Sequence, residues 1–336
     1  MDRPPFDPAS FAFQLCADAW LAKAAWAAVR RGVPDAVGDE PVELAALARA
    51  TGTQPGALGR LMRALAAHGI FERMDGDRFA HSPLSRALRR PPQGGGVFLD
   101  SVLGDFHWDA WAALDASVAT GRSGVEIRFG QPAFDYLADH PDEAQRFAAA
   151  MSANTVTDEV AILTNWRPGP FRRAIDVGGS HGSLVRALLR AAPEARGLVY
   201  DRSEIVATGP VVTAGDPVAA RLDWEAGDFF ERVPEGGDLY LLKHILHDWD
   251  DAECRTILAH VRAALAPDGR VAVFEMLLPA TSQPHPAWLL DINMLVNTHG
   301  RERSEAEFAA LLAQSGLRHV RTTPVGRVQV IEAVAA

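Results

Sequence analysis

The sequence predicts an α/β protein whose Rossmann-like, doubly wound sheet follows an all-helical, winged-helix-like domain. From Phe171 onward, short β-like runs alternate with helical ones, which is typical of parallel strands joined by crossover helices. The last two β-like runs, 317–326 and 327–335, are separated only by a turn, so we expect a C-terminal antiparallel hairpin on the edge of the sheet. In such sheets, ligands bind at the carboxyl ends of the parallel strands.

The N-terminal part has the pattern of a winged helix. Residues 41–89 predict a helix, a turn at 51–53, a second helix and a short hairpin around Asp75 and Gly76. Upstream, a predicted helix over 11–33 is apolar on more than one face, so one domain cannot bury all of it. A second copy of the chain would cover the remaining apolar face, which predicts a homodimer through this domain. Proline and glycine at 89–96 punctuate its end. We therefore expect three parts, namely a dimerisation domain (1–96), a helical linker that contributes to the substrate pocket (97–165) and the sheet domain (166–336).

Composition excludes several classes of protein. A formal net charge of −10 argues against general binding to nucleic acid or anionic membranes. Cys16 and Cys254 are far apart, with no Cys/His cluster, so neither a disulfide framework nor a metal site is predicted. No apolar run reaches the ~18 residues of a membrane span, and no signal segment is evident. We expect a cytoplasmic protein.

The stretch AIDVGGSHGSLVRALL, residues 174–189, runs from a strand through small residues into an amphipathic helix. A dinucleotide-binding loop needs glycine at the first, third and sixth places of G-x-G-x-x-G, where this chain has Gly178, Ser180 and Ser183. A P-loop is excluded because no Gly-Lys-Ser/Thr follows. What remains is an acid followed by three glycines: Asp176, Gly178, Gly179 and Gly182.

Two more acids end the next β-like runs. Asp201 is placed to accept the hydroxyls of a ribose, and Asp228 ends the third run. Asp176 suits a cationic group better than a diphosphate. A single strand-end aspartate is often only a helix cap, so the ordered series of three carries the inference. It favours a nucleoside with a positive charge and no phosphates, which describes S-adenosylmethionine.

Together with the winged-helix-like N-terminal region, five motifs give a pattern over nearly the whole chain: AIDVGGSHGSL, GDFF, LLKHILHDWDDAECRTIL, FEMLLP and LDINMLVNTHGRERSEAEF. In these the chain resembles the small-molecule O-methyltransferases typified by plant caffeate and flavonoid enzymes and by bacterial enzymes that tailor aromatic polyketides. The resemblance implies S-adenosylmethionine as methyl donor, bound by the domain 166–336, and a small aromatic substrate. The chain departs from the family at Ser180, at Arg202-Ser203 and over 123–130.

Carried over residue by residue, the resemblance implies cofactor contacts from the glycines of the 178–182 loop, Asp201, Asp228, Phe229 and Lys243. The implied base is His247, flanked by Asp248 and held by Glu275 and Glu302. Histidine suits removal of a phenolic proton because its pKa is near neutral, and a carboxylate fixes its tautomer. The three side chains follow strands that end at one edge of the sheet, whereas His244 is expected to pack against the sheet.

The acceptor is not named by the sequence. Aromatic, thioether and amide side chains suit a flat phenolic molecule, and we expect its pocket to include Trp108, Phe147, Met151, Asp291, Met294 and Asn297.

Two alternatives remain open. One is an enzyme of the same fold that performs hydroxylation, decarboxylation or pericyclic chemistry. The other is a DNA-binding regulator, which the predicted recognition helix argues against because it carries only Arg60 and Arg63 and is mostly apolar.

Overall fold

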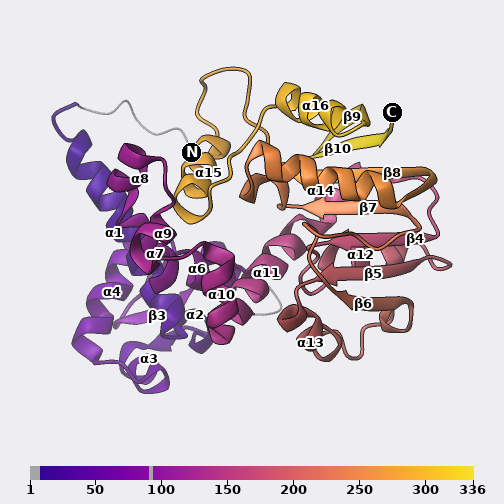
Figure 1. Ribbon diagram of the computed structural model, residues 1–336. Helices are drawn as coiled ribbons and strands as arrows, with labels where there is room; N and C mark the ends of the chain where they lie inside the picture. The colour runs from indigo at the N-terminus through magenta and orange to yellow at the C-terminus, as the bar shows by residue number, and fades with distance from the viewer. Residues whose placement is uncertain (1–7, 91–93) are drawn as a thin grey trace. The chain divides into compact units, whose positions relative to one another are not determined.

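The computed structural model describes residues 8–90 and 94–336 (Figure 1). The chain divides into two compact units, of which the first ends at Trp108 and the second begins at Asp109. The sequence placed the end of the first domain at residue 96, but helix α6 (Gly95–Val102) packs against α1 (Phe11–Arg30) within the first unit. The finer division into three parts stays a prediction.

The first unit is helical and carries a small antiparallel sheet of order β1-β3-β2. Its elements after α1 are α2 (Val33–Ala36), β1 (Val42–Glu43), α3 (Leu44–Thr51), α4 (Pro55–Ala67), β2 (Phe71–Met74), β3 (Arg78–His81), α5 (Pro83–Ala87) and α6. The order from α3 to β3 is the one that the sequence predicts, with Gly52 in the left-handed turn between the two helices. The expected single helix over 11–33 is wrong at its end, because Gly32 adopts φ +72° and separates α1 from α2.

The core of the first unit lies between α1, α3, α4 and the small sheet, with Leu47, Met62, Leu65, Phe71 and Phe79 almost fully buried. The N-terminal half of α1 takes little part in it. Large apolar side chains there stay exposed, with Phe13 at 67%, Leu15 at 53% and Trp20 at 61%.

Helix α7 (Asp105–Trp111) spans the division between the units. The second unit continues with α8 (Leu114–Thr120), α9 (Gly124–Phe129), α10 (Ala133–Asp139) and the long α11 (Pro141–Asn165). The predicted helical character of this region is therefore correct.

A seven-stranded sheet follows, in the order β6-β5-β4-β7-β8-β10-β9. Its strands are β4 (Arg173–Val177), β5 (Arg196–Asp201), β6 (Leu222–Ala226), β7 (Gly237–Lys243), β8 (Leu265–Glu275), β9 (Leu317–Val325) and β10 (Val328–Ala335). Strands β4 to β8 form a parallel sheet, whereas β10 is antiparallel to both β8 and β9. The predicted doubly wound sheet with a terminal hairpin is confirmed.

Helices cover both faces of this sheet (Figure 1). They are α11, α12 (Ser183–Ala191), α13 (Ser203–Val212), α14 (Asp251–Ala264) and α16 (Glu305–Gln314). Helix α15 (Pro286–Asn297) packs instead against α8 and α9, and the second unit also has short 3₁₀ turns η1 (Ala219–Arg221) and η2 (Leu246–Asp248). Side chains alternate between the faces, so Tyr240 and Leu242 join the core with α14 and α16, whereas Leu239 and Leu241 join the one with α11 and α12. Strands buried on both faces read as continuous apolar runs, as in 239–242.

The strand order reverses at β4, which has β5 on one side and β7 on the other. The carboxyl ends of β4, β5, β7 and β8 therefore line the crevice where doubly wound sheets bind ligands. Among the described residues, no helix is both long and apolar enough to cross a bilayer.

Candidate active site

The turn after β4 approaches its neighbours too closely for side chains. Gly178 has φ +67°, and a Cβ there would lie 2.4 Å from Ile245 Cδ1. A Cβ on Gly179 would lie 2.6 Å from Asp176 Cγ. Glycine is required at both places because any larger residue would displace the strand-end acid or the β7–η2 segment.

Asp176 is buried at the end of β4, and within the described part of the chain its side chain accepts one hydrogen bond, from the Val185 N–H at 3.4 Å. Burial raises its pKa to about 7, since one long hydrogen bond compensates little of the lost hydration. A buried carboxyl of this kind favours a cationic partner.

Asp201, at the end of β5, faces the same turn. Its Oδ2 accepts the Ser180 N–H at 2.8 Å and its Oδ1 accepts the Arg202 N–H at 2.7 Å. Ser180 reaches this position with φ +51°, a left-handed conformation that glycine adopts more easily. The serine that departs from the family pattern therefore still presents its backbone N–H to the acid.

Lys243 ends β7 and is held from α11. Its Nζ lies 3.2 Å from Asp158 Oδ2, and both side chains are about 95% buried. Arg327 donates to the other oxygen of Asp158 at 2.7 Å. Burial lowers the pKa of Lys243, although Asp158 opposes this. Asp158 is not recognisable from the sequence, because nothing in a helical pattern shows which of its acids is buried.

A pocket joins these groups at the carboxyl edge. It is lined by Met151, Ser152, Thr155, Asp176, Gly178, Gly179, Ser180, Ser183, Leu184 and Lys243. Met151, which was expected to contact the acceptor, thus shares a pocket with the predicted cofactor residues. Asp228 is exposed after β6 and caps the following turn by accepting the Phe230 N–H at 2.7 Å, and Phe229 is half-buried beside it.

The predicted catalytic residues come together from three segments. His247 in η2 places Nδ1 2.7 Å from Glu302 Oε1 and 3.5 Å from Glu275 Oε2. Its backbone N–H also donates to Glu275 Oε1 at 3.3 Å. Its Nε2 lies 3.8 Å from Asp248 Oδ1. Since Nδ1 is engaged by carboxylates, Nε2 is the nitrogen left to exchange a proton.

Burial and charge act against each other in this cluster. Burial lowers the pKa of His247, but the surrounding carboxylates Glu275, Glu302 and Asp248 outweigh it and raise that pKa to about 10. Burial raises the pKa of Glu275 to about 7 and that of Asp248 to about 6. The cluster binds protons tightly, as expected of four titratable groups that share a site poor in water.

Two features hold η2 against the Glu302 loop. Arg303 is fully buried and donates to the Leu246 carbonyl at 2.9 Å and to Asp251 Oδ1 at 2.7 Å. Gly300 passes so close that a Cβ would lie 2.0 Å from the His247 carbonyl oxygen. Glu302 is 1% exposed, so it is buried and does not belong to a solvated charge cluster with its sequence neighbours.

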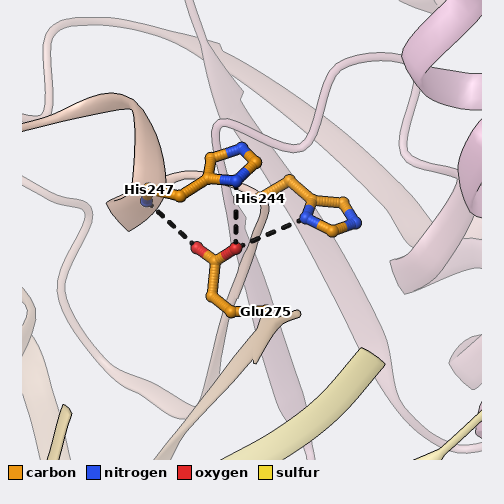
Figure 2. A group of neighbouring side chains, drawn as sticks. All are labelled: His244, His247 and Glu275. Carbon is orange, nitrogen blue, oxygen red and sulfur yellow. Dashed lines mark hydrogen bonds and ion pairs between the residues drawn. The ribbon is translucent and has the colours of Figure 1, made fainter. Parts of the chain in front are cut away.

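His244 differs from the expectation. Instead of only packing, its Nδ1 lies 3.3 Å from Glu275 Oε2, and its ring stacks on that of His247 with centroids 5.1 Å apart (Figure 2). Donor atoms of His244, His247 and Glu275 all lie within 4.8 Å of one another, as metal ligands can. The hydrogen bonds and ion pairs among them account for this cluster, and the absence of a metal stays a prediction.

The predicted acceptor residues are dispersed. Asp291 accepts the Glu302 N–H at 2.9 Å and so supports the catalytic loop. Met294 and Asn297 are buried on the same helix, and among the described residues Asn297 Oδ1 has no hydrogen-bond partner. Phe147 is half-buried on α11. Trp108 belongs to the first unit, where Lys23 Nζ lies 4.7 Å from its ring.

Two family models match the chain. Residues 111–318 match an O-methyltransferase domain, and residues 13–90 match an O-methyltransferase dimerisation domain. The chain belongs to the O-methyltransferase family. The winged-helix-like region of this O-methyltransferase is thereby assigned to a dimerisation domain, which leaves nothing to favour a DNA-binding regulator.

Curated relatives include enzymes that methylate oxygen and nitrogen. The O-methyltransferase is 38% identical to the O-demethylpuromycin-O-methyltransferase of Streptomyces alboniger, over 95% of this chain and 89% of that one. It is 34% identical to a phenazine-1-carboxylate N-methyltransferase of Pseudomonas aeruginosa, over 90% of each chain.

Solved structures agree over the whole length. LaPhzM superposes with a TM-score of 0.93 at 32% identity, covering 98% of this chain and 100% of that one. NcsB1, an O-methyltransferase from neocarzinostatin biosynthesis, superposes with a TM-score of 0.77 at 27% identity, covering 94% and 96% of the chains. That structure holds S-adenosyl-L-homocysteine and 1,4-dihydroxy-2-naphthoic acid.

Proposed function

We propose that this O-methyltransferase transfers a methyl group from S-adenosylmethionine to a phenolic hydroxyl of a small aromatic secondary metabolite, with His247 as general base. The observation that carries the proposal is the 2.7 Å contact between His247 Nδ1 and Glu302, at the strand edge that also carries the glycine turn. A histidine held in this way has one nitrogen committed to a carboxylate and one available to the acceptor.

The residues after β4, β5 and β7 fit S-adenosylmethionine. The buried carboxyl of Asp176 favours a cation, and the Asp201 carboxylate, fixed by two backbone N–H groups, keeps lone pairs for ribose hydroxyls. Lys243 and the Gly178–Gly179 turn complete the proposed binding site, with Asp228 and Phe229 after β6. When bound, S-adenosylmethionine supplies a methyl group made electrophilic by the sulfonium.

His247 takes the acceptor's proton at Nε2 while its Nδ1–H donates to Glu302. Loss of the acceptor's proton leaves its oxygen with the electron pair that would form the new O–CH₃ bond. The S–CH₃ bond of the methyl donor would break at the same time, and its electron pair would stay on sulfur in S-adenosylhomocysteine. Glu275 and Glu302 stabilise the imidazolium that forms, and Asp248 lies on the Nε2 side.

The raised pKa of His247 sets a condition on this mechanism. With a pKa of about 10 in the ligand-free protein, the imidazole holds its proton at neutral pH and is not yet a base. A cation bound beside the buried acids offsets the negative field that raises this pKa. We expect S-adenosylmethionine to lower the His247 pKa more than S-adenosylhomocysteine does, because only the former carries the sulfonium charge. Histidine NMR titration with each ligand tests this, and equal shifts would contradict it.

The acceptor pocket remains the least defined part of the proposal. We propose that helices of the second unit between residues 109 and 165 contribute to it and that Asp291, Met294 and Asn297 line it from α15. Asn297 Oδ1, buried without a hydrogen-bond partner among the described residues, suits a hydroxyl or N–H of the acceptor.

The test is transfer of labelled methyl from S-adenosylmethionine to a panel of phenolic and arylamine acceptors. We expect label in an aryl methyl ether. If label appeared only in methylated amines, the acceptor atom would be nitrogen and not a hydroxyl oxygen, as in the N-methyltransferase relative. A changed product without label would show that the fold serves a different chemistry.

We also propose a homodimer through residues 13–90, since the N-terminal half of α1 exposes Phe13, Leu15 and Trp20. Sedimentation equilibrium of wild type and of Trp20→Glu tests it. A wild-type monomer at micromolar concentration would contradict the dimer. The matched control is Val118→Glu, whose side chain is 68% exposed on α8 outside the dimerisation match.

A further inference from the structure

His244 lies in an unusual backbone position directly after β7. Its φ of +53° is left-handed, which non-glycine residues seldom adopt. Its N–H donates to the Phe274 carbonyl at 3.0 Å, so the residue is anchored beside the end of β8, one residue before Glu275. This conformation turns the side chain toward the Glu275 carboxylate instead of continuing the strand (Figure 2).

Glu275 depends on few donors. It is 0% exposed, and its Oε1 accepts the His247 backbone N–H at 3.3 Å. Its Oε2 faces His244 Nδ1 at 3.3 Å and His247 Nδ1 at 3.5 Å, but the latter nitrogen is engaged by Glu302 at 2.7 Å. Among the described residues, His244 is therefore the side chain that hydrogen-bonds Glu275 Oε2.

The protonation state of His244 follows from its surroundings. Burial, with Lys243, His247 and Arg327 nearby, holds its pKa well below the ordinary value, so the ring is neutral. Above the Glu275 pKa of about 7 this carboxylate only accepts hydrogen bonds, so the neutral imidazole that faces it must carry its proton on the facing nitrogen. His244 is thus an Nδ1–H donor toward Glu275.

We propose that His244 is a positioning residue of this active site, which fixes the Glu275 carboxylate through its Nδ1–H and thereby keeps His247 oriented. The proposal rests on the proposed function of His247 as base. A metal held by His244, His247 and Glu275 fits less well, because it would have to displace Glu302 from His247 Nδ1.

Loss of this donor should pass through Glu275 to His247. A fully buried carboxylate oxygen without a hydrogen bond is costly, so Glu275 would take up a proton or rotate. His247 would then lose one of the negative charges that raise its pKa. The other charged groups around the pair stay in place, namely Lys243 on β7, Asp248 in η2, Glu302 before α16 and Arg327 before β10.

Two substitutions separate the hydrogen bond from the ring. His244→Phe keeps an aromatic ring over His247 but has no donor. His244→Asn loses the ring but keeps an N–H near the position of Nδ1, and asparagine tolerates the left-handed backbone. His319→Phe is the control, because His319 makes a comparable side-chain contact, 3.0 Å to Thr322 Oγ1, on the edge strand β9.

We expect His244→Phe to lower single-turnover methyl transfer by about 10- to 100-fold with unchanged S-adenosylmethionine affinity, because His247 would lose its orientation toward the acceptor. The His247 pKa, measured by NMR, should fall, and His244→Asn should restore most of both. His319→Phe should match wild type in both readouts.

A folded His244→Phe protein with wild-type rate and wild-type His247 pKa would overturn the proposal, as would an Asn variant no better than Phe. The NMR readout keeps the two proposals apart. A fallen His247 pKa supports the positioning role even if no acceptor is methylated, and in that case the proposed function fails alone.

Discussion

Two acids of the second unit, the half-buried Asp216 and the buried Asp176, are held in opposite ways. Asp216, in the turn after α13, accepts hydrogen bonds from Arg186, Arg190 and the Val218 N–H. Burial alone would raise its pKa, but these donors outweigh that and lower it to about 2. Asp176, at the end of β4, has one long hydrogen bond and a pKa of about 7. The first acid ties helices together, whereas the second remains undercompensated at the edge where a ligand binds.

The difference shows where this fold uses charge for stability and where for function. A carboxylate with two arginines needs nothing more, so ligand binding would only compete with its partners. A carboxylate without them is destabilising in the free protein and gains most from a bound cation. Glu275 and His247 resemble Asp176 in this respect, since burial and neighbouring charges shift their pKa values far from the ordinary ones.

The largest contrast should appear in catalysis. His247→Ala should slow methyl transfer by ~10²–10⁴-fold at neutral pH, with part of the loss recovered as pH approaches the acceptor's own pKa. Asp216→Asn should leave the rate unchanged, because its network lies outside the reacting groups. Single-turnover kinetics against pH measure both, and equal rates for wild type and His247→Ala would remove His247 from the mechanism.

Glu302→Gln should have the next largest effect. The amide keeps the size of the side chain but not the charge that stabilises the imidazolium, so we expect a loss of about 10- to 100-fold in rate. Combined with His247→Ala it should add little, because the two act as one unit. Additive losses in the double variant would show that Glu302 acts on something other than His247.

Substitution by asparagine should change the free energy of unfolding in opposite directions at Asp216 and Asp176. Asp216→Asn should lower the free energy of unfolding by about 1–3 kcal/mol, since it removes charged hydrogen bonds. Asp176→Asn should raise it in the ligand-free protein at pH 8 while weakening S-adenosylmethionine binding. Denaturant unfolding and calorimetry give the two numbers. A destabilised Asp176→Asn that binds as wild type would reverse the comparison.

The pH dependence of stability sharpens the same contrast. The raised pKa of Asp176 contributes stability below its unfolded value of 3.8 that is lost as pH rises through about 7. The advantage of Asp176→Asn should therefore widen from pH 4 to pH 8, by at most ~1.4 kcal/mol per pH unit. The lowered pKa of Asp216 contributes stability above 3.8 that is lost as pH falls through about 2. Unfolding curves at several pH values test both, and a constant advantage of the Asn variant would exclude a shifted Asp176.

The smallest effect is expected at Ser180, which belongs to neither group. Glycine would relieve the left-handed conformation but lose the Oγ contact to the Ala148 carbonyl and gain freedom in the unfolded chain. We expect Ser180→Gly to change the free energy of unfolding by less than ~1 kcal/mol. Cofactor affinity should hold, because Ser180 reaches Asp201 through its backbone N–H. A tenfold change in affinity would show that the hydroxyl matters.

Local sequence patterns predicted much of this architecture. Alternating strand and helix runs predicted the order from β4 to β8, and two runs joined by a turn predicted β9 and β10. The same patterns place Asp176, Asp201 and Glu275 at strand ends, which meet at one edge in a parallel sheet. The roles predicted for His247 and Glu275 came from the resemblance to the methyltransferase family. The length of α1 was misjudged at Gly32, since its left-handed turn overrides an apolar pattern that continues to Val33.

The tertiary structure alone decided which charges are buried and which atoms face them. His244, Asp158, Asp291 and Arg303 look in the sequence like packing, surface or pocket residues, yet each holds a proposed site residue or its segment. Their roles arise from contacts between residues distant in the chain, such as α11 against β7 or the Glu302 loop against η2. The field that sets the pKa of His247 is the sum of three carboxylates from different segments, and only their distances in the folded chain determine it.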